Sequence, residues 1–213
     1  MDGQAVIGEA VIGNETELRA LYGTPSGLSV VKELDHVDPY CRRFIELSPF
    51  LCLGTSSPDG KQDVSPRGDM PGFVQVLDAR TLAIPDRPGN NRLDSLGNLT
   101  AHPEVGLLFL VPGFDETLRI NGVASLSTDP ALLASMAVNG KAPKAAIKVA
   151  VREVYFHCGK AIKRSKLWDP ATQVKRSELP SLARMILDQS GSTVMTVEQA
   201  EARTEEGYRN RLW

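Results

Sequence analysis

The stretch QDVSPRGDMPGFVQVLDARTLAIPDRPGNNRLDS, residues 62–95, joins two short apolar runs to arginines that lie beside turn residues. The runs, Phe73–Leu77 and Thr81–Ile84, are rich in residues that favour strands. The arginines just outside them are Arg67, Arg87 and Arg92. Arginine binds phosphate bidentately and keeps its charge when desolvated, so together they favour an anionic ligand. Solvated surface charge is the alternative interpretation of each one.

The segment PGNNRLDSL follows the second run and is typical of a turn that leads into a helix. We expect a helix over Arg92–Ala101, capped by Asn90 or Asn91, with Asp94 in its first turn. A helix N-terminus next to arginines is a natural site for an anion.

The rest of the chain predicts more short strands, separated and followed by helices. Residues 50–56, 61–65, 104–111, 117–126 and 145–156 are strand-like. Residues 104–111, EVGLLFLV, are almost continuously apolar, which is typical of a strand buried on both faces. In residues 117–126 the alternation places Arg119 and Asn121 on one polar face. Since no regular alternation of strands and helices is present, we expect a mainly β fold, an antiparallel barrel with flanking helices.

The boundaries of this pattern suggest three parts. We expect an N-terminal helical extension over residues 1–48, the barrel over 49–170 and C-terminal helices over 171–213. From Lys141 to Arg176 the chain holds ten basic residues and two acids. Such a segment favours an anion site or a contact between subunits, and a solvated face is the alternative.

Composition argues against several classes of protein. The 213 residues carry a formal charge of −2, so nucleic acid is not an expected partner. No apolar run approaches the roughly 18 residues of a membrane helix, and the acidic N-terminus does not resemble a signal peptide. Three cysteines without CxxC spacing favour reduced thiols and a cytoplasmic location.

Motifs that would supply catalytic chemistry were not found. GxGxxG, GxxxxGK[ST], GxSxG and HExxH are absent, and the three histidines are far apart in sequence. We therefore expect no metal site and name no catalytic residue. An anion-binding protein without its own nucleophile or proton relay suggests that a bound cofactor performs the chemistry.

Four segments together resemble the pyridoxamine 5′-phosphate oxidase-like family of FMN-binding split β-barrel proteins, in particular its branch of probable FMN-dependent enzymes. The segments are VSPRGDMPGF, TLAIPDRPGNNRLDSLGNL, HPEVGLLFLVPGFDETLRINGVASL and FHCGKAIKRSKLW, and the resemblance covers about residues 40–170. It implies a six-stranded antiparallel split barrel that forms a homodimer, with FMN in each of two clefts between the subunits. The chain ends EEGYRNRLW and lacks the Arg-x-His segment of true pyridoxamine-phosphate oxidases, which argues against that substrate.

The resemblance also implies residues that bind the cofactor. Arg67 would hold the phosphate or ribityl chain, and the backbone of Ala83 and Ile84 would contact the flavin. The remaining implied positions fall into three groups: the phosphate-binding turn and helix start (Asn91, Arg92 and Ser95), a strand that reaches the flavin of the partner subunit (Arg119 and Asn121), and a C-terminal motif near the cofactor (Lys160, Arg164 and Trp168).

Two functional hypotheses follow. The first is a flavoprotein oxidoreductase in which bound FMN transfers electrons or a hydride between small molecules of unknown identity. The second is a non-catalytic carrier or sensor of the same fold that binds flavin, haem or deazaflavin. Neither requires an ionisable catalytic residue, so the sequence alone does not separate them.

Overall fold

The computed structural model describes residues 11–25 and 27–213, which form two compact units, one ending at Glu33 and the other running from Leu34 to Trp213. The first unit contains α1 (Glu15–Tyr22), which Asn14 caps, and α2 (Leu28–Val31). Both helices are short, and neither contains a buried residue.

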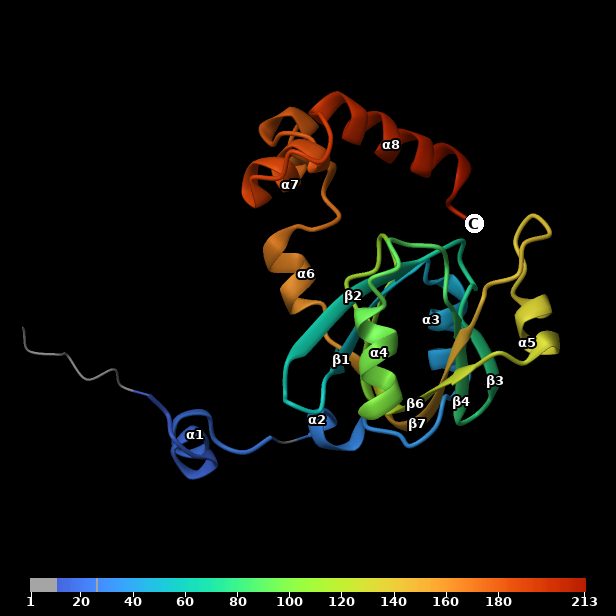
Figure 1. The fold of residues 1–213 in the computed structure, drawn as a ribbon. Coiled ribbons are helices and arrows are strands. Elements are labelled where there is room, and N and C mark those ends of the chain that lie inside the picture. Colours follow the sequence, from blue (N-terminus) through green and yellow to red (C-terminus); the bar gives the residue numbers. More distant parts are fainter. Residues whose placement is uncertain (1–10, 26) are drawn as a thin grey trace, which may run out of the picture. The chain divides into compact units, whose positions relative to one another are not determined.

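The second unit is built on one antiparallel sheet (Figure 1). Its strands are β1 (Phe50–Ser56), β2 (Gln62–Gly68), β3 (Gln75–Asp78), β4 (Thr81–Pro85), β5 (Glu104–Leu110), β6 (Thr117–Ser127) and β7 (Ala146–His157). Its helices are α3 (Pro39–Leu47), α4 (Asp94–Ala101), α5 (Pro130–Ser135), α6 (Lys160–Ser165), α7 (Leu182–Ser190) and α8 (Val197–Asn210), with 3₁₀ turns at Pro170–Thr172 and Arg176–Glu178.

The strand order is β2-β1-β5-β6-β7-β4-β3, and every pairing is antiparallel. In the described sheet β2 and β3 are the two edges, so the barrel stays open between them. This is the predicted split barrel with flanking helices, with a seventh strand beyond the expected six. Pro66 lies inside β2, which continues to Gly68 rather than ending at residue 65. An edge strand tolerates proline because the missing N–H need not join a ladder.

Alternating side chains build the core on the inner face of the sheet. Leu51 and Leu53 of β1, Leu107 and Phe109 of β5, and Leu118 and Ile120 of β6 are at most 1% exposed. Each alternates with residues that are exposed or only half-buried. Buried apolar surface stabilises folding by about 25 cal/mol per Å², so this alternation fixes the register of the sheet.

The sequence predicts that the strand over residues 104–111 is buried on both faces, but in the single chain it is buried on one face. In β5 only Val105, Leu107 and Phe109 are buried, whereas Gly106, Leu108 and Leu110 are half-exposed. The buried side chains of β5 belong to the core into which α3 and α4 also pack, and the residues that alternate with them are more exposed. A continuous apolar sequence therefore does not mean that its own chain covers both faces.

Two helices cover the inner side of the sheet. Asp38 caps α3 by accepting a hydrogen bond from Cys41 N at 2.7 Å, and α3 buries Phe44 and Ile45. Helix α4 lies across the strands (Figure 1), contacts β1, β2 and β6, and buries Leu99. Burial raises the pKa of the Cys41 thiol to about 12, so this cysteine is a core residue rather than a nucleophile.

A bulge between β6 and β7 requires glycine at position 122. The register shifts after Asn121, where Arg152 is left without an opposite residue. A Cβ on Gly122 would lie 2.3 Å from the carbonyl oxygen of Ala150, which no side chain tolerates. The extra residue in β7 lets Val151 and Val154, which are three positions apart, both face the core.

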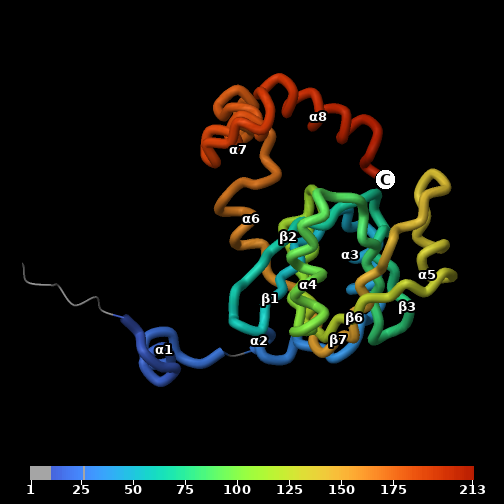
Figure 2. The backbone as a smooth tube through the Cα atoms, viewed as in Figure 1, coloured from blue at the N-terminus to red at the C-terminus, as the bar shows by residue number. Residues whose placement is uncertain are grey.

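The C-terminal residues form an arm of helices that lies beside the strands and returns to them near Trp213, as Figure 2 shows. Its helices α7 and α8 lie within residues 171–213 and contact each other. Thr196 and Gln199 form a capping box at the start of α8. No helix among the described residues has the length and apolar character needed to span a membrane.

Candidate anion-binding site between the sheet edges

The inner face of β2 and the segment after β4 enclose a cavity of about 520 Å³. Three alternate residues of β2 line one wall, and they face the same way as the buried Leu51, Leu53 and Thr55 opposite them on β1. The other walls come from the segment between β4 and α4, the first turn of α4, the stretch before β7 and Trp213. The residues that line the cavity include Asp63, Ser65, Arg67, Asp86, Arg87, Asn91, Arg92, Ser95, Lys141, Lys144 and Trp213.

Two ion pairs join the end of β2 to the segment that follows β4. Arg67 Nη1 of β2 donates to Asp86 Oδ1, which directly follows β4, at 2.9 Å. In the second pair the arginine follows β4 and the aspartate follows β2: Arg87 Nε donates to Asp69. The side chains of Arg67, Asp86 and Arg87 are only 15–19% exposed. Partly buried pairs of this kind are screened less by salt than surface pairs, so they hold both arginines at the cavity.

Asp69 is the most enclosed group of this cluster, with a side chain that is 1% exposed. Burial acts to raise the pKa of Asp69, but hydrogen bonds from Trp213, from Met70 N–H and from Arg87 outweigh it and hold the pKa below its usual value. Trp213 Nε1 donates to Asp69 Oδ1 at 3.0 Å. Residues 144 positions apart in the sequence thus meet at one carboxylate.

The predicted cap and start of the helix after β4 are wrong. Helix α4 begins at Asp94 rather than Arg92, and Leu93 stands at its N-cap with a left-handed backbone (φ 61°) and no side-chain cap within the described chain. Asn91 is also left-handed, with φ 59°. Asn90 Oδ1 accepts instead from Arg92 N at 3.0 Å, so the asparagine closes a local turn. The two left-handed residues turn the chain before a helix can form.

This geometry leaves the N-terminus of α4 open toward the cavity. Leu93, Asp94, Ser95 and Leu96 all line it. The first amides of a helix have no intrahelical acceptor, and an uncapped start leaves them available to an anion. The positive end of the helix dipole adds to this attraction.

Arg92 lies at the solvent side of the cavity and is 72% exposed. Its Nε donates to Asp94 Oδ2 at 2.8 Å, a bond that raises the pKa of Arg92 and lowers the pKa of Asp94. An exposed pair of this kind contributes little to stability. The guanidinium is therefore free to exchange this partner for a ligand at small cost.

Four residues of the cavity wall form a partly buried hydrogen-bond chain. Ser95, 3% exposed, donates from Oγ to Asp63 Oδ2 at 2.6 Å, and its Oγ lies 2.8 Å from Ser65 Oγ. Arg67 Nε donates to Ser65 Oγ at 3.3 Å. Ser95, expected from the sequence as a cofactor contact, thus touches Arg67 through Ser65.

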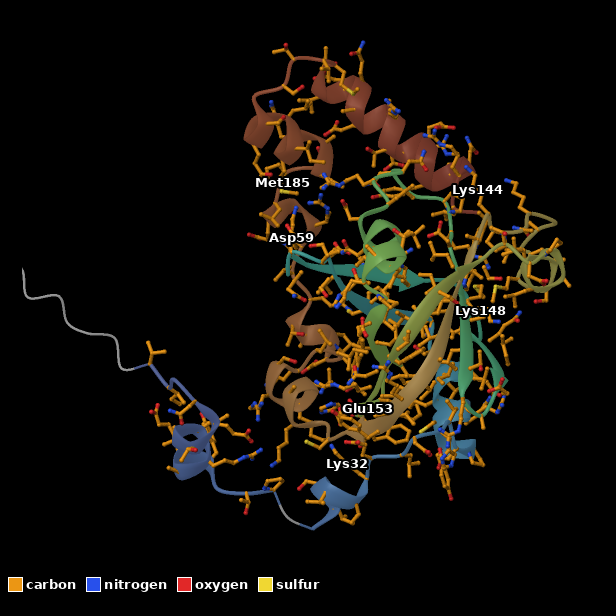
Figure 3. The ribbon with its side chains drawn as sticks, turned by 60° about the horizontal axis from the view of Figure 1, so that its bottom comes forward. Lys32, Asp59, Lys144, Lys148, Glu153 and Met185 are labelled. Carbon is orange, nitrogen blue, oxygen red and sulfur yellow. The ribbon has the colours of Figure 1, made fainter. Side chains whose placement is uncertain are left out.

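The stretch before β7 supplies two lysines to the cavity. Lys141 Nζ donates to the backbone oxygen of Trp213 at 3.2 Å. Lys144, labelled in Figure 3, makes no hydrogen bond or ion pair with any residue in the described part of the chain. In all, five basic side chains line the cavity against three carboxylates, so its charge favours an anionic ligand.

Four of the predicted cofactor residues, Arg67, Asn91, Arg92 and Ser95, meet in this one cavity. Ala83 and Ile84 lie on β4, fully buried, shortly before Asp86. Their side chains belong to the core, so only backbone contact with a ligand remains open to them. That contact stays a prediction.

Arg119 and Asn121 lie on the outer face of β6, away from the cavity. Arg119 Nη1 donates to Tyr155 Oη at 2.8 Å. Asn121 Nδ2 donates to Glu153, which is labelled in Figure 3. Asn121 lines a separate outer groove of about 420 Å³, whose other lining residues include Gly54, Gly106 and Gly122. One chain does not bring these side chains to the Arg67 cavity, and their role at a partner subunit's cofactor stays a prediction.

Lys160, Arg164 and Trp168 are also not among the residues that line the cavity. Lys160 and Arg164 lie on α6, which is exposed, and they form no ion pair within residues 11–25 and 27–213. Trp168 Nε1 donates to the carbonyl oxygen of Phe114 at 2.7 Å. The predicted approach of the basic pair to a cofactor would require a second subunit.

Several residues of the cavity were not predicted as site residues. Asp86 has a signal in the sequence, since it directly follows the strand that ends at Pro85. Asp63 and Ser65 alternate with Arg67 along β2, which places all three on one face. Lys141, Lys144 and Trp213 have no local signal, because only tertiary structure brings them here. No group of side chains suited to holding a metal ion was found in the residues that are described.

Comparison with solved structures gives several similar chains at low sequence identity. A variant of HupZ from Group A Streptococcus is 16% identical, covering 57% of this chain and 99% of that one with a TM-score of 0.46. A pyridoxamine 5′-phosphate oxidase-like protein from Lactobacillus delbrueckii is 19% identical, covering 58% and 98% with a TM-score of 0.46. General stress protein 26 from Bacillus anthracis is 16% identical, covering 54% and 88% with a TM-score of 0.42. Similarity at this level indicates nothing about function.

A search of curated proteins found no match. The family model described as pyridoxamine 5′-phosphate oxidase matches residues 37–158. This span runs from the residue before the α3 cap to just past the end of β7, and it includes every residue that lines the cavity except Trp213. The chain belongs to the pyridoxamine 5′-phosphate oxidase family.

Proposed function

We propose that the cavity binds the phosphate of FMN and that the protein is an FMN-dependent oxidoreductase acting on a small molecule. The observation that carries the proposal is the open N-terminus of α4 beside a partly buried arginine with a spare donor. Arg67 uses Nε and Nη1 within the protein, while its Nη2 has no partner among the described residues. A phosphate monoester, with about two negative charges, matches these donors.

The residues present fit this group in size and charge. Small-molecule sites typically enclose roughly 300–1,000 Å³, and this cavity of about 520 Å³ lies within that range. Its basic residues exceed its carboxylates, and the paired aspartates keep Arg67 and Arg87 in place before a ligand arrives. Such preorganisation lowers the cost of binding an anion.

Each wall has a separate role in the proposal. Arg67 Nη2 and the first amides of α4 bind phosphate oxygens, while Arg92 closes the solvent side. Lys144, with no ion pair in the described chain, adds a further charge. Bound FMN would supply the electron or hydride transfer, and the protein would supply binding, orientation and exclusion of water.

We further propose that the protein works as a homodimer. The outer face of β2, β1 and β5 carries Val64, 71% exposed, and Phe50, 36% exposed, beside the half-exposed Cys52, Leu108 and Leu110. A second copy on this face would cover these apolar side chains, which supports the prediction that Arg119 and Asn121 reach the cofactor of the partner.

Absorption spectroscopy with anaerobic reduction tests the proposal. The purified protein, or the protein reconstituted with FMN and freed of excess, is expected to be yellow, and NAD(P)H should bleach it in the absence of oxygen. Yellow protein that no reduced nicotinamide bleaches would favour a carrier over an oxidoreductase. Colourless protein that retains no added FMN, or protein with a haem Soret band, would contradict the proposed cofactor.

A further inference from the structure

The wall of the cavity contains a hydrogen-bond chain whose direction follows from the protons available. It runs from Arg67 Nε to Ser65 Oγ at 3.3 Å, from Ser65 to Ser95 Oγ at 2.8 Å, and from Ser95 to Asp63 Oδ2 at 2.6 Å. An ionised carboxylate only accepts, and a guanidinium only donates. The two ends of the chain therefore fix which way each hydroxyl points.

The two serines consequently have no proton left for a ligand. Each hydroxyl has one hydrogen. Ser95 uses its hydrogen on Asp63, so Ser65 must be the donor in the bond between the serines, and Ser65 in turn accepts from Arg67. Thr55 Oγ1 also donates to Asp63 Oδ2, at 3.5 Å, and accepts from Asn98 Nδ2 at 3.0 Å, so the carboxylate is held from two sides.

This arrangement fixes Arg67 at two of its three nitrogens. Ser65 holds Nε and Asp86 holds Nη1, and the side chain is 18% exposed. Nη2 has no partner in the described chain, so it is available to bind a ligand in the cavity. A guanidinium held at two nitrogens loses less side-chain freedom when it binds a ligand than one that is held at none.

We infer that Asp63, Ser95 and Ser65 are positioning residues for Arg67, and that Ser95 supports binding of a phosphate monoester through Arg67 rather than by donating to the phosphate. The inference rests on the proposed function, because it assumes a phosphate in this cavity. It assigns the serine at the start of α4 a different task from the direct cofactor contact that the family resemblance implies.

A thermodynamic cycle between positions 95 and 67 tests the inference. The readout is the ratio of the dissociation constants of riboflavin and FMN, which reports the phosphate alone. Ser95→Ala in the wild-type background should lower this ratio roughly 2- to 10-fold, as expected for a lost hydrogen bond. In an Arg67→Ala background the same substitution should change the ratio less than about 2-fold, since residues that act through one another are not additive.

Other outcomes have distinct meanings. An equal loss from Ser95→Ala in both backgrounds would show a direct bond to the phosphate and overturn the inference, as would no loss in the wild type. If Arg67→Ala itself leaves the ratio unchanged, Arg67 does not bind the phosphate. That result would contradict the proposed function and, with it, the role of the hydrogen-bond chain. Ser65→Ala should reproduce the pattern of Ser95→Ala independently.

Thr100→Ala is the matched control. Thr100 lies on the same helix, and its hydroxyl donates to the carbonyl oxygen of Gly97 at 2.8 Å and to no other residue that the structure describes. The ratio should be unchanged in this variant. A loss equal to that of Ser95→Ala would assign the effect to helix stability rather than to the hydrogen-bond chain, and would contradict the inference.

Discussion

Replacing Trp213 by phenylalanine should release the C-terminal arm from the barrel. The indole Nε1 of Trp213 donates to Asp69 Oδ1 at 3.0 Å, and the Asp69 side chain is 1% exposed. Phenylalanine keeps most of the apolar area and removes the donor. Asp69 retains its bonds from Met70 N–H and Arg87, so the variant leaves no buried charge without a partner.

The expected effect follows from the charge of the acceptor. A hydrogen bond to a charged group contributes about 1.5–3 kcal/mol, so the population of the undocked arm should rise roughly 10- to 150-fold. Helix α8 packs on α7, and the bonds of Trp213 to Asp69 and Lys141 join its end to the barrel. Segments with few buried contacts open locally at low free energy.

Hydrogen exchange of the α8 amides, with limited proteolysis of residues 197–210, measures this opening. Exchange and cleavage should accelerate by that factor in Trp213→Phe, while the amides of β5 and β6 stay protected. Trp168→Phe is the matched control, because it removes the bond to Phe114 and leaves the arm docked. Equal exchange rates of α8 in wild type and Trp213→Phe would refute this account of the arm.

Three further predictions concern charge, assembly and pH. In flavin fluorescence titrations Arg92→Ala should weaken FMN binding less than 10-fold, and less than Arg67→Ala does. The reason is that Arg92 is 72% exposed, whereas Arg67 is 18% exposed. A larger effect of Arg92→Ala than of Arg67→Ala would contradict the proposed roles of the two arginines. Leu108→Arg on the outer face of β5 should convert a dimer to a monomer in light scattering, and a monomeric wild type would contradict the dimer. Because the folded pKa of Asp69 is depressed, its contribution to stability is present above its unfolded pKa of about 3.9 and is lost as pH falls below that value. The wild type should therefore exceed Asp69→Asn in free energy of unfolding at pH 6 and lose this advantage toward pH 3, and a constant difference in denaturant unfolding would count against it.

The sequence predicts the strands well because burial on one face imposes an alternation that is visible locally. The β6 pattern, with Leu118 and Ile120 inside and Arg119 outside, appears in the structure as expected. The start of α4 was misplaced because Asn91 and Leu93 adopt left-handed conformations, which no residue pattern announces for leucine.

The sequence predicts only those cavity residues that have a local signal. Arg67 and Arg92 lie next to strand and helix ends, so turn residues mark them. Trp213 and Lys144 reach the cavity through tertiary packing across long stretches of chain, which leaves no local signal. The hydrogen-bond chain through Ser95 has no signal in the sequence, because its direction depends on which oxygen atoms lie within bonding distance of one another.

Titration of the wild-type protein with FMN and with riboflavin tests the central claim most directly. The two ligands differ only in the phosphate, which the account places at Arg67 and the first turn of α4. Two charged hydrogen bonds of about 1.5 kcal/mol each predict that FMN binds roughly 100-fold more tightly than riboflavin. Equal affinities for the two flavins would contradict a phosphate site in this cavity.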